Sequence, residues 1–162
     1  MALFNIRVYG LLLNERNEVL VSDEWIRGML ITKFPGGGLE FGEGSRDCLA
    51  REFMEEMNLK VCVGEHLYTT DFYQQSAFNP AHQIVSIYYL VQALEPITVR
   101  INTEPFDFDE AQNARYERDR QCEAFRFIPL HKFSEADLNL PIDKVAARVF
   151  RQNIDKIQNK VT

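Results

Sequence analysis

The sequence predicts a single domain of the α/β class. Its 162 residues fit one domain of ordinary size, and 46% hydrophobic with 12% aromatic residues is sufficient for a packed core. Segments with strand composition are interleaved with two segments of helical periodicity. No internal repeat, low-complexity tract or long linker divides them, so we expect one domain over residues 1–162.

Composition excludes several classes of function. The net charge of −6 opposes a sequence-independent grip on nucleic acid, which depends on Lys and Arg neutralising phosphates. The thiols Cys48, Cys62 and Cys122 lack C-x-x-C spacing, which disfavours a disulfide framework or a zinc knuckle and favours a reducing cytoplasm. The N-terminus does not resemble a signal peptide, and no run of about 18 apolar residues indicates a membrane span.

The first strands follow from apolar, β-branched segments. Residues 4–13 and 18–22 flank the turn composition of 14–17, which predicts a hairpin. Residues 29–34 continue as a short strand. Pro35 to Gly38 is then expected to break regular structure, because proline removes a donor and glycine admits unusual conformations.

A helix is expected from Ser45 to Met57. At 100° per residue its glutamates Glu52, Glu55 and Glu56 fall within an arc of about 100°. A separate arc, which can pack on a sheet, holds Leu49, Ala50, Phe53, Met54 and Met57. An amphipathic surface helix is the simpler interpretation, but like charges at i, i+4 repel by about 0.2–0.5 kcal/mol and lie near the negative end of the helix dipole. Magnesium prefers carboxylate oxygens and would convert this repulsion into coordination.

The remaining elements follow in order. Residues 61–72 and 83–94 predict long strands, and residues 97–102 a further strand. The charged stretch 102–123 is either a mobile loop or a short helix. Residues 125–128 alternate like a half-buried strand that Pro129 ends.

The C-terminal segment predicts a second helix, which begins at Pro141. Apolar residues recur there at steps of three and four and form one stripe: Ile142, Val145, Ala146, Val149, Phe150, Ile154 and Ile157. A packing role explains this stripe without any ligand.

The segment from Gly37 to Leu59 resembles the Nudix box, G-x5-E-x7-R-E-U-x-E-E-x-G-U, in which U is a bulky aliphatic or aromatic residue. Gly37 is followed after five residues by Glu43 and then after seven by the remaining matches, Arg51-Glu52, Phe53, Glu55-Glu56 and Leu59. Only Asn58 departs, where the pattern has glycine. Asparagine is the best substitute for glycine in a left-handed helix end, so we expect a small stability cost and unaltered chemistry.

The resemblance implies a Nudix-like α/β/α sandwich with a mixed central β-sheet. It also implies that Glu52, Glu55 and Glu56 bind Mg²⁺, that Glu43 lies beside the metal, and that Arg51 holds the loop and the helix together. Manganese should substitute, because it prefers the same oxygen ligands. Homodimers are common in the family.

Glycines and several side chains are candidates for substrate binding. Gly36, Gly37 and Gly38 either allow close backbone approach to a diphosphate or merely form a tight turn. For stacking on a base or pairing with phosphate the candidates are Arg27, Phe34, Trp25, Tyr73 and Phe78, although a structural role is the default for each.

A further acid is expected to activate the attacking water, because ligated carboxylates are poor bases. The candidates are Glu117, Asp119 and Glu123 before the strand at Phe125, with Glu43 as the alternative within the box. We select Glu123, because the adjacent strand can fix its position and a base must be held within hydrogen-bond reach.

These residues predict a pyrophosphohydrolase that cuts a phosphoanhydride in a small nucleotide-like substrate, such as a nucleoside triphosphate or a nucleotide sugar. A P-loop is excluded because Gly44-Ser45 lacks the required lysine. The alternative function is a Nudix-like module that senses a nucleotide without cleaving it. The complete carboxylate set favours catalysis.

Overall fold

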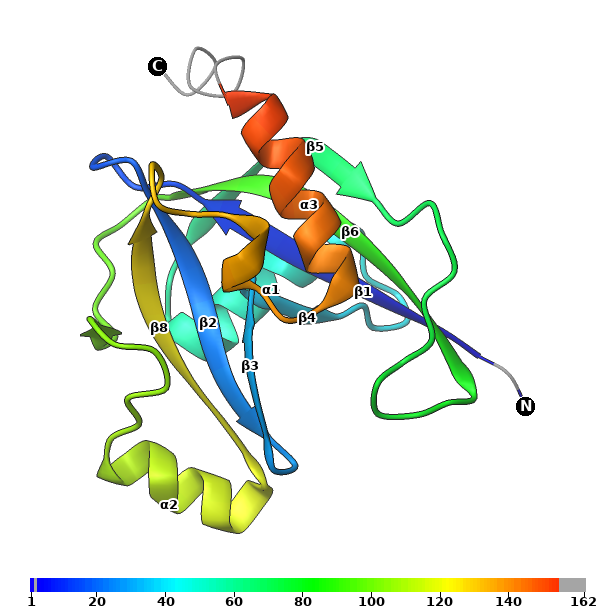
Figure 1. The fold of residues 1–162 in the computed structure, drawn as a ribbon, viewed down its shortest axis with the longest axis horizontal. Coiled ribbons are helices and arrows are strands. Elements are labelled where there is room, and N and C mark those ends of the chain that lie inside the picture. Colours follow the sequence, from blue (N-terminus) through cyan, green and yellow to red (C-terminus); the bar gives the residue numbers. More distant parts are fainter. Residues whose placement is uncertain (2, 155–162) are drawn as a thin grey trace.

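The computed structural model describes residues 1 and 3–154 and has helices on both sides of its strands (Figure 1). The strands are β1 (Leu3–Leu12), β2 (Glu18–Ile26), β3 (Met29–Lys33), β4 (Gly36–Gly38), β5 (Val61–Thr69), β6 (His82–Ala93), β7 (Ile101–Asn102) and β8 (Gln121–Pro129). The helices are α1 (Ser45–Met57), α2 (Glu110–Asp119) and α3 (Pro141–Gln152), and a single 3-10 turn spans Glu135–Asp137.

The strands form two four-stranded sheets, and both sheets are mixed. One has the order β4-β1-β6-β5, in which β1 and β6 are parallel. The other has the order β3-β2-β8-β7, in which β7 and β8 are parallel. The predicted α/β class with mixed β-structure is confirmed, and the β-structure is divided between two sheets.

Alternating side chains of the central strands place one helix on each side. Tyr9 and Leu11 of β1 belong to the hydrophobic cluster that includes α3, whereas Val8 and Leu12 belong to the cluster that includes α1. Successive strand residues point to opposite faces, so β1 packs against both helices. Figure 1 shows α3 in front of the strands and α1 behind them, which gives three layers.

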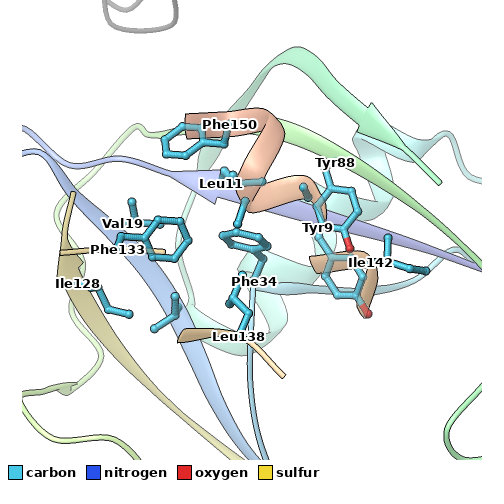
Figure 2. Packing of buried hydrophobic residues seen from close by; sticks show 13 residues of the cluster. Tyr9, Leu11, Val19, Phe34, Tyr88, Ile128, Phe133, Leu138, Ile142 and Phe150 are labelled. Carbon is cyan, nitrogen blue, oxygen red and sulfur yellow. The ribbon is translucent and has the colours of Figure 1, made fainter. Parts of the chain in front are cut away.

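The cluster on the α3 side is rich in aromatic residues (Figure 2). Phe34 lies at its centre and contacts the rings of Phe133 and Tyr88 at centroid distances of 6.0 and 6.1 Å. Complete burial of such a side chain contributes about 1.5–3 kcal/mol. The α3 residues that close this core include Ile142, Ala146 and Phe150, as the apolar stripe predicts.

The predicted hairpin of the first two strands is wrong. β1 and β2 lie in different sheets and share only the isolated bridge between Leu13 and Val19. The turn does reverse the chain, since the Asn14 N–H donates to the Glu18 carbonyl at 3.0 Å. However, β1 pairs with β6 along ten residue pairs, and this partner lies far away in the sequence.

The expected break at the glycines is also wrong. Residues 36–38 form strand β4, which pairs with β1 in the register Arg7–Gly38, Val8–Gly37 and Tyr9–Gly36. Gly36 has a φ of +141°, and a Cβ there would lie 2.1 Å from the Val8 carbonyl oxygen. Glycine therefore permits strand pairing at a distance that no side chain would allow.

The other expected elements are present with shifted ends. β5 ends at Thr69, β7 has only two residues, and residues 110–119 of the charged stretch form α2, the helical alternative. The apolar stripe continues past the end of α3 to Ile154, which packs on the core, and Ile157 lies outside the described residues. Within the described part of the chain no helix is long and apolar enough to cross a bilayer.

Candidate active site

Helix α1 presents an apolar side to the core and a carboxylate side to a cleft. Its buried residues are Cys48, Leu49, Phe53 and Met57. Met54 departs from the predicted packing arc, because 38% of its surface is exposed. Glu52, Glu55 and Glu56 all line a cleft on the other side of the helix.

Asn58 ends α1 as expected from its substitution for glycine. It adopts the left-handed conformation, with φ of 48° and ψ of 42°. Its backbone N–H donates to the Met54 carbonyl at 3.0 Å. The helix thus stops directly after the carboxylate pair 55–56, and the chain turns into β5.

Arg51 connects the loop before α1 to the helix. Its guanidinium donates to both carboxylate oxygens of Glu43, at 3.0 and 2.6 Å, and to the Gly38 carbonyl at 3.1 Å. It also donates to Glu52 at 3.0 Å and to Glu55 at 3.3 Å. One arginine therefore fixes the loop, the end of β4 and two of the cleft carboxylates.

Glu52 lies directly against β4. A Cβ built at Gly37 would lie 2.4 Å from the Glu52 carboxylate carbon, so only glycine leaves room for this carboxylate. The Glu52 side chain is 13% exposed, whereas that of Glu55 is 59% exposed. The glycine strand therefore acts as a cradle for the inner carboxylate.

Glu56 is the most deeply placed carboxylate of the helix. Its Oε2 atom is buried and has no hydrogen-bond partner. Burial raises the pKa of Glu56 to about 8, against the opposing effect of the Lys33 ammonium group. A buried carboxylate oxygen without a donor is costly, and a cation would supply the missing partner.

The three helix carboxylates fit a magnesium ion by their chemistry. Hard divalent cations prefer carboxylate oxygens, and the free Oε2 atom of Glu56 points to such a ligand. No three Asp, Glu, His or Cys side chains among the described residues converge as a ready set of ligands. Glu52 and Glu55 both accept hydrogen bonds from Arg51, which holds these two carboxylates toward the arginine.

The carboxylates line a cavity of about 310 Å³, which we call the acidic cleft. Its walls come from β1, β2, β4, α1, α2 and the start of β8. The residues are Arg7, Glu24, Ile26, Gly36, Gly37, Gly38, Glu52, Glu55, Glu56, Arg115, Gln121, Cys122 and Glu123.

Glu123 is the candidate base that lies in this cleft. Its carboxylate accepts from Arg115 of α2 at 2.8 Å, and its backbone carbonyl accepts from the Gln112 side chain at 2.9 Å. Glu117 and Asp119 lie on α2 and are not among the residues that line the cleft. Glu43 accepts hydrogen bonds from Arg51 that lower its pKa to about 2, which makes it a weak base.

A second cavity of about 170 Å³, the apolar cavity, adjoins the acidic cleft. The two share Arg7, Glu24 and Ile26. Its other apolar and aromatic lining residues are Tyr9, Ile31, Ala77, Phe78, Ile84, Tyr88, Leu140, Pro141 and Ile142. Polar groups also reach it, among them Asn5, Gln74 and Asp143.

The predicted substrate residues lie in different places. Phe78 lines the apolar cavity, whereas Phe34 is fully buried in the core. Arg27 lies in the turn between β2 and β3, outside the lining of both cavities, with its guanidinium 5.9 Å from the Phe78 ring centroid. Trp25 stacks on Tyr116 of α2 at a centroid distance of 3.5 Å. Tyr73 is 69% exposed.

Besides Arg115 of α2 and Asp143 of α3, sequence reasoning missed three charged strand residues of the two cavities. They are Arg7 of β1, Glu24 of β2 and Lys33 of β3, and Lys33 pairs with Glu24 at 2.9 Å. None belongs to a motif. Arg7 is the single charge within an apolar strand, whereas Glu24 follows Asp23 and Lys33 ends its strand. The fold decides which sheet face each one occupies.

Comparison with known protein families identifies the family to which this chain belongs. The family profile described as NUDIX domain matches residues 3–150. The chain belongs to the NUDIX domain family. The resemblance of Gly37 to Leu59 to the Nudix box is therefore confirmed, and the NUDIX domain spans almost the whole described chain.

Solved NUDIX structures share this fold at low sequence identity. A NUDIX hydrolase from Nitrosomonas europaea has 15% identity and a TM-score of 0.63, with 92% of this chain and 89% of that chain covered. A MutT protein from Methanosarcina mazei Go1 has 18% identity and a TM-score of 0.63, covering 94% and 96%. An ADP-ribose pyrophosphatase from Streptococcus suis 89-1591 has 16% identity and a TM-score of 0.55, covering 88% of each chain. The α/β/α expectation is thereby confirmed.

Proposed function

We propose that this NUDIX protein is a magnesium-dependent hydrolase of a phosphoanhydride bond. Its substrate would be a nucleoside diphosphate linked to another moiety, as in nucleoside triphosphates and nucleotide sugars. The observation that carries the proposal is the buried Glu56 oxygen without a hydrogen-bond partner, in a cleft with Glu52, Glu55 and Glu123.

Glu52, Glu55 and Glu56 would hold the magnesium ion, and manganese would substitute for it. When bound there, the ion would neutralise charge on the phosphoryl oxygens of the substrate. Gly37 lets Glu52 approach β4, and Arg51 keeps the loop and the helix in register. Glu123 accepts the proton of the attacking water, because it lies in the cleft and is not one of the three helix carboxylates assigned to the metal.

The apolar cavity would take the nucleoside. Its aromatic and apolar lining suits a flat base, and its polar groups supply hydrogen bonds that fix orientation. The apolar cavity shares three lining residues with the acidic cleft. One substrate could therefore place its nucleoside in the apolar cavity and its diphosphate in the acidic cleft.

A panel of nucleotides tests this proposal. Nucleoside triphosphates, nucleotide sugars and ADP-ribose are incubated with the protein and Mg²⁺, and the products are separated by chromatography. We expect one substrate class to be cleaved at an anhydride bond, and Glu56→Gln to abolish this cleavage. A nucleotide that binds and stays intact would instead support the alternative, a nucleotide-sensing module without turnover.

We also propose a cytoplasmic location, a homodimer, and no binding of nucleic acid. Free Cys48, Cys62 and Cys122 fit a reducing compartment, and the net charge of −6 disfavours a nucleic-acid backbone. Size-exclusion chromatography with light scattering measures the oligomeric state, and a mass of one chain, 18.9 kDa, would contradict the dimer.

A further inference from the structure

Arg7 lies where the two cavities meet. It comes from β1, in the middle of its sheet, and it pairs in register with Gly38 of β4. It lines both the acidic cleft and the apolar cavity. If Gly38 carried a Cβ, the nearest atom to it would be Nη1 of Arg7, at 3.8 Å.

The Tyr9 hydroxyl holds this guanidinium in place, and core residues hold Tyr9. The Arg7 Nε donates to the Tyr9 hydroxyl at 2.6 Å, and the Tyr9 ring packs on Tyr88 at a centroid distance of 5.5 Å. Tyr88 in turn donates to the fully buried Asp143 at 2.5 Å. The charge is thus positioned by the core, and a group that is already ordered loses less entropy on binding a ligand.

Arg7 differs from the neighbouring cations in its partners. Arg115 forms an ion pair with Glu123 at 2.8 Å, and Lys33 forms one with Glu24 at 2.9 Å. No ion pair within 4.0 Å among the described residues includes Arg7, although its side chain is partly buried. Tyr9 and the more distant charges of Glu24 and Glu52 raise the pKa of Arg7, but neither carboxylate forms a direct ion pair with it. Within the described chain the Nη groups are therefore free of a carboxylate partner, and a phosphate in the cleft would supply an anionic one.

We propose that Arg7 binds the phosphate joined directly to the nucleoside and thereby sets which phosphate reaches the carboxylates of α1. This inference rests on the proposed function, because it takes the apolar cavity as the nucleoside site. A guanidinium donates through several N–H groups in a planar fork that matches phosphate oxygens. With Nε occupied by Tyr9, the Nη groups are the ones that would contact phosphate.

The test compares a nucleoside with its own monophosphate. Adenosine, guanosine, cytidine and uridine and their 5′-monophosphates are titrated, without metal, into wild-type, Arg7→Gln and Arg7→Lys protein, and binding is followed by NMR shift changes. We expect Arg7→Gln to weaken monophosphate binding by about 10- to 100-fold and to leave nucleoside binding unchanged. Arg7→Lys should recover part of the loss, because it keeps the charge. Arg148→Gln, which removes an exposed arginine paired with Glu135, is the matched control.

Four outcomes would overturn the inference. Equal binding of the monophosphate by wild type and Arg7→Gln would show that Arg7 does not contact phosphate. An equal loss for nucleoside and monophosphate would show that Arg7 only supports the cavity. If wild type cleaves nucleotides in the panel but prefers nucleoside over monophosphate, Arg7 is misassigned while the proposed function stands. Absence of both cleavage and nucleotide binding would overturn the two together.

Discussion

Replacing Gly37 by alanine tests whether contact between Glu52 and β4 sets the chemistry. A Cβ at Gly37 would lie 2.4 Å from the Glu52 carboxylate carbon, whereas carbon atoms at optimal contact are separated by about 3.5–4.0 Å. The carboxylate must therefore withdraw by about 1 Å. A misplacement of about 1 Å can cost about a hundredfold in rate, so we expect kcat/KM of Gly37→Ala to fall by roughly that factor.

The stability of this variant should change little. The group that must move is the end of a flexible side chain, so we expect the free energy of unfolding to stay within about 1 kcal/mol of wild type. Gly36→Ala is the matched contrast. There the Cβ would meet the Val8 carbonyl oxygen at 2.1 Å, and the backbone has a φ of +141°. That variant should lose at least about 2 kcal/mol of stability or fail to fold.

The assay is the initial rate on the best substrate of the nucleotide panel at saturating Mg²⁺, together with thermal unfolding followed by circular dichroism. A Gly37→Ala protein with normal melting temperature and near-normal kcat/KM would refute the reasoning, because Glu52 could then work from a displaced position. Equal destabilisation by both alanine variants would refute the distinction between side-chain and backbone contacts.

Four further outcomes are expected. Glu56→Gln keeps the shape and removes the charge, so turnover should fall by orders of magnitude, and normal turnover would contradict a ligand role. The melting temperature without metal at pH 7 should rise, because burial raises the pKa of Glu56 to about 8 and glutamine carries no charge to bury. Excess chelator should abolish turnover, and Mg²⁺ should raise the melting temperature modestly, whereas full activity in chelator would exclude metal dependence. Glu123→Gln should lower kcat by roughly a hundredfold or more and retain Mg²⁺ binding. Glu117 lies outside the cleft, so Glu117→Gln should keep the wild-type kcat. Equal kcat values for the two variants would leave Glu123 without a role as base. For Asp143→Asn the free energy of unfolding, measured with urea, is compared with that of wild type at each pH. This difference should shift in favour of the variant by about 3 kcal/mol from about pH 3.5 to pH 7.

The sign of the last prediction follows from burial. Burial raises the pKa of Asp143 from its ordinary 3.8 to about 6, so the folded wild type binds more protons than the unfolded chain between these values. Stability therefore falls as pH rises through this window, by about 1.36 kcal/mol per pH unit. Asparagine does not titrate, and a difference from wild type that is independent of pH would contradict the assignment.

Local patterns predicted the elements whose partners are close in the sequence. Helix α1 followed from its periodicity, whereas its end at Asn58 and the contacts of Arg51 with the loop were implied by the resemblance to the Nudix box. Glu123 lies in the cleft, held by the strand that the sequence predicted beside it, and its role as a base stays a prediction. The pairing of β1 with β6 could not be predicted, since an apolar strand buried on both faces carries no register signal that selects its partner.

Residues whose role depends on the packing of distant segments were missed or misplaced. Arg7 enters the site only because β4 lies beside β1, and the glycines that allow this approach were expected to break the strand. Trp25 was a candidate for stacking on a base, but its ring is covered by Tyr116, which lies 91 positions later in the printed sequence. An aromatic side chain in a strand has the same sequence signal whether its partner is a ligand or another ring.

Helices α1 and α2, which form two walls of the acidic cleft, should differ in thermal stability, because α2 is attached by fewer buried residues. The wall made by α1 is anchored in the core by Leu49 and Phe53, whereas α2 has a single buried residue, Tyr116. That residue is held by its stack on Trp25 and by its hydroxyl, which accepts from the Gly28 N–H at 2.9 Å. Segments with few buried apolar contacts open before the whole fold does. Thermal inactivation should therefore begin with release of α2, at temperatures where both sheets are still intact.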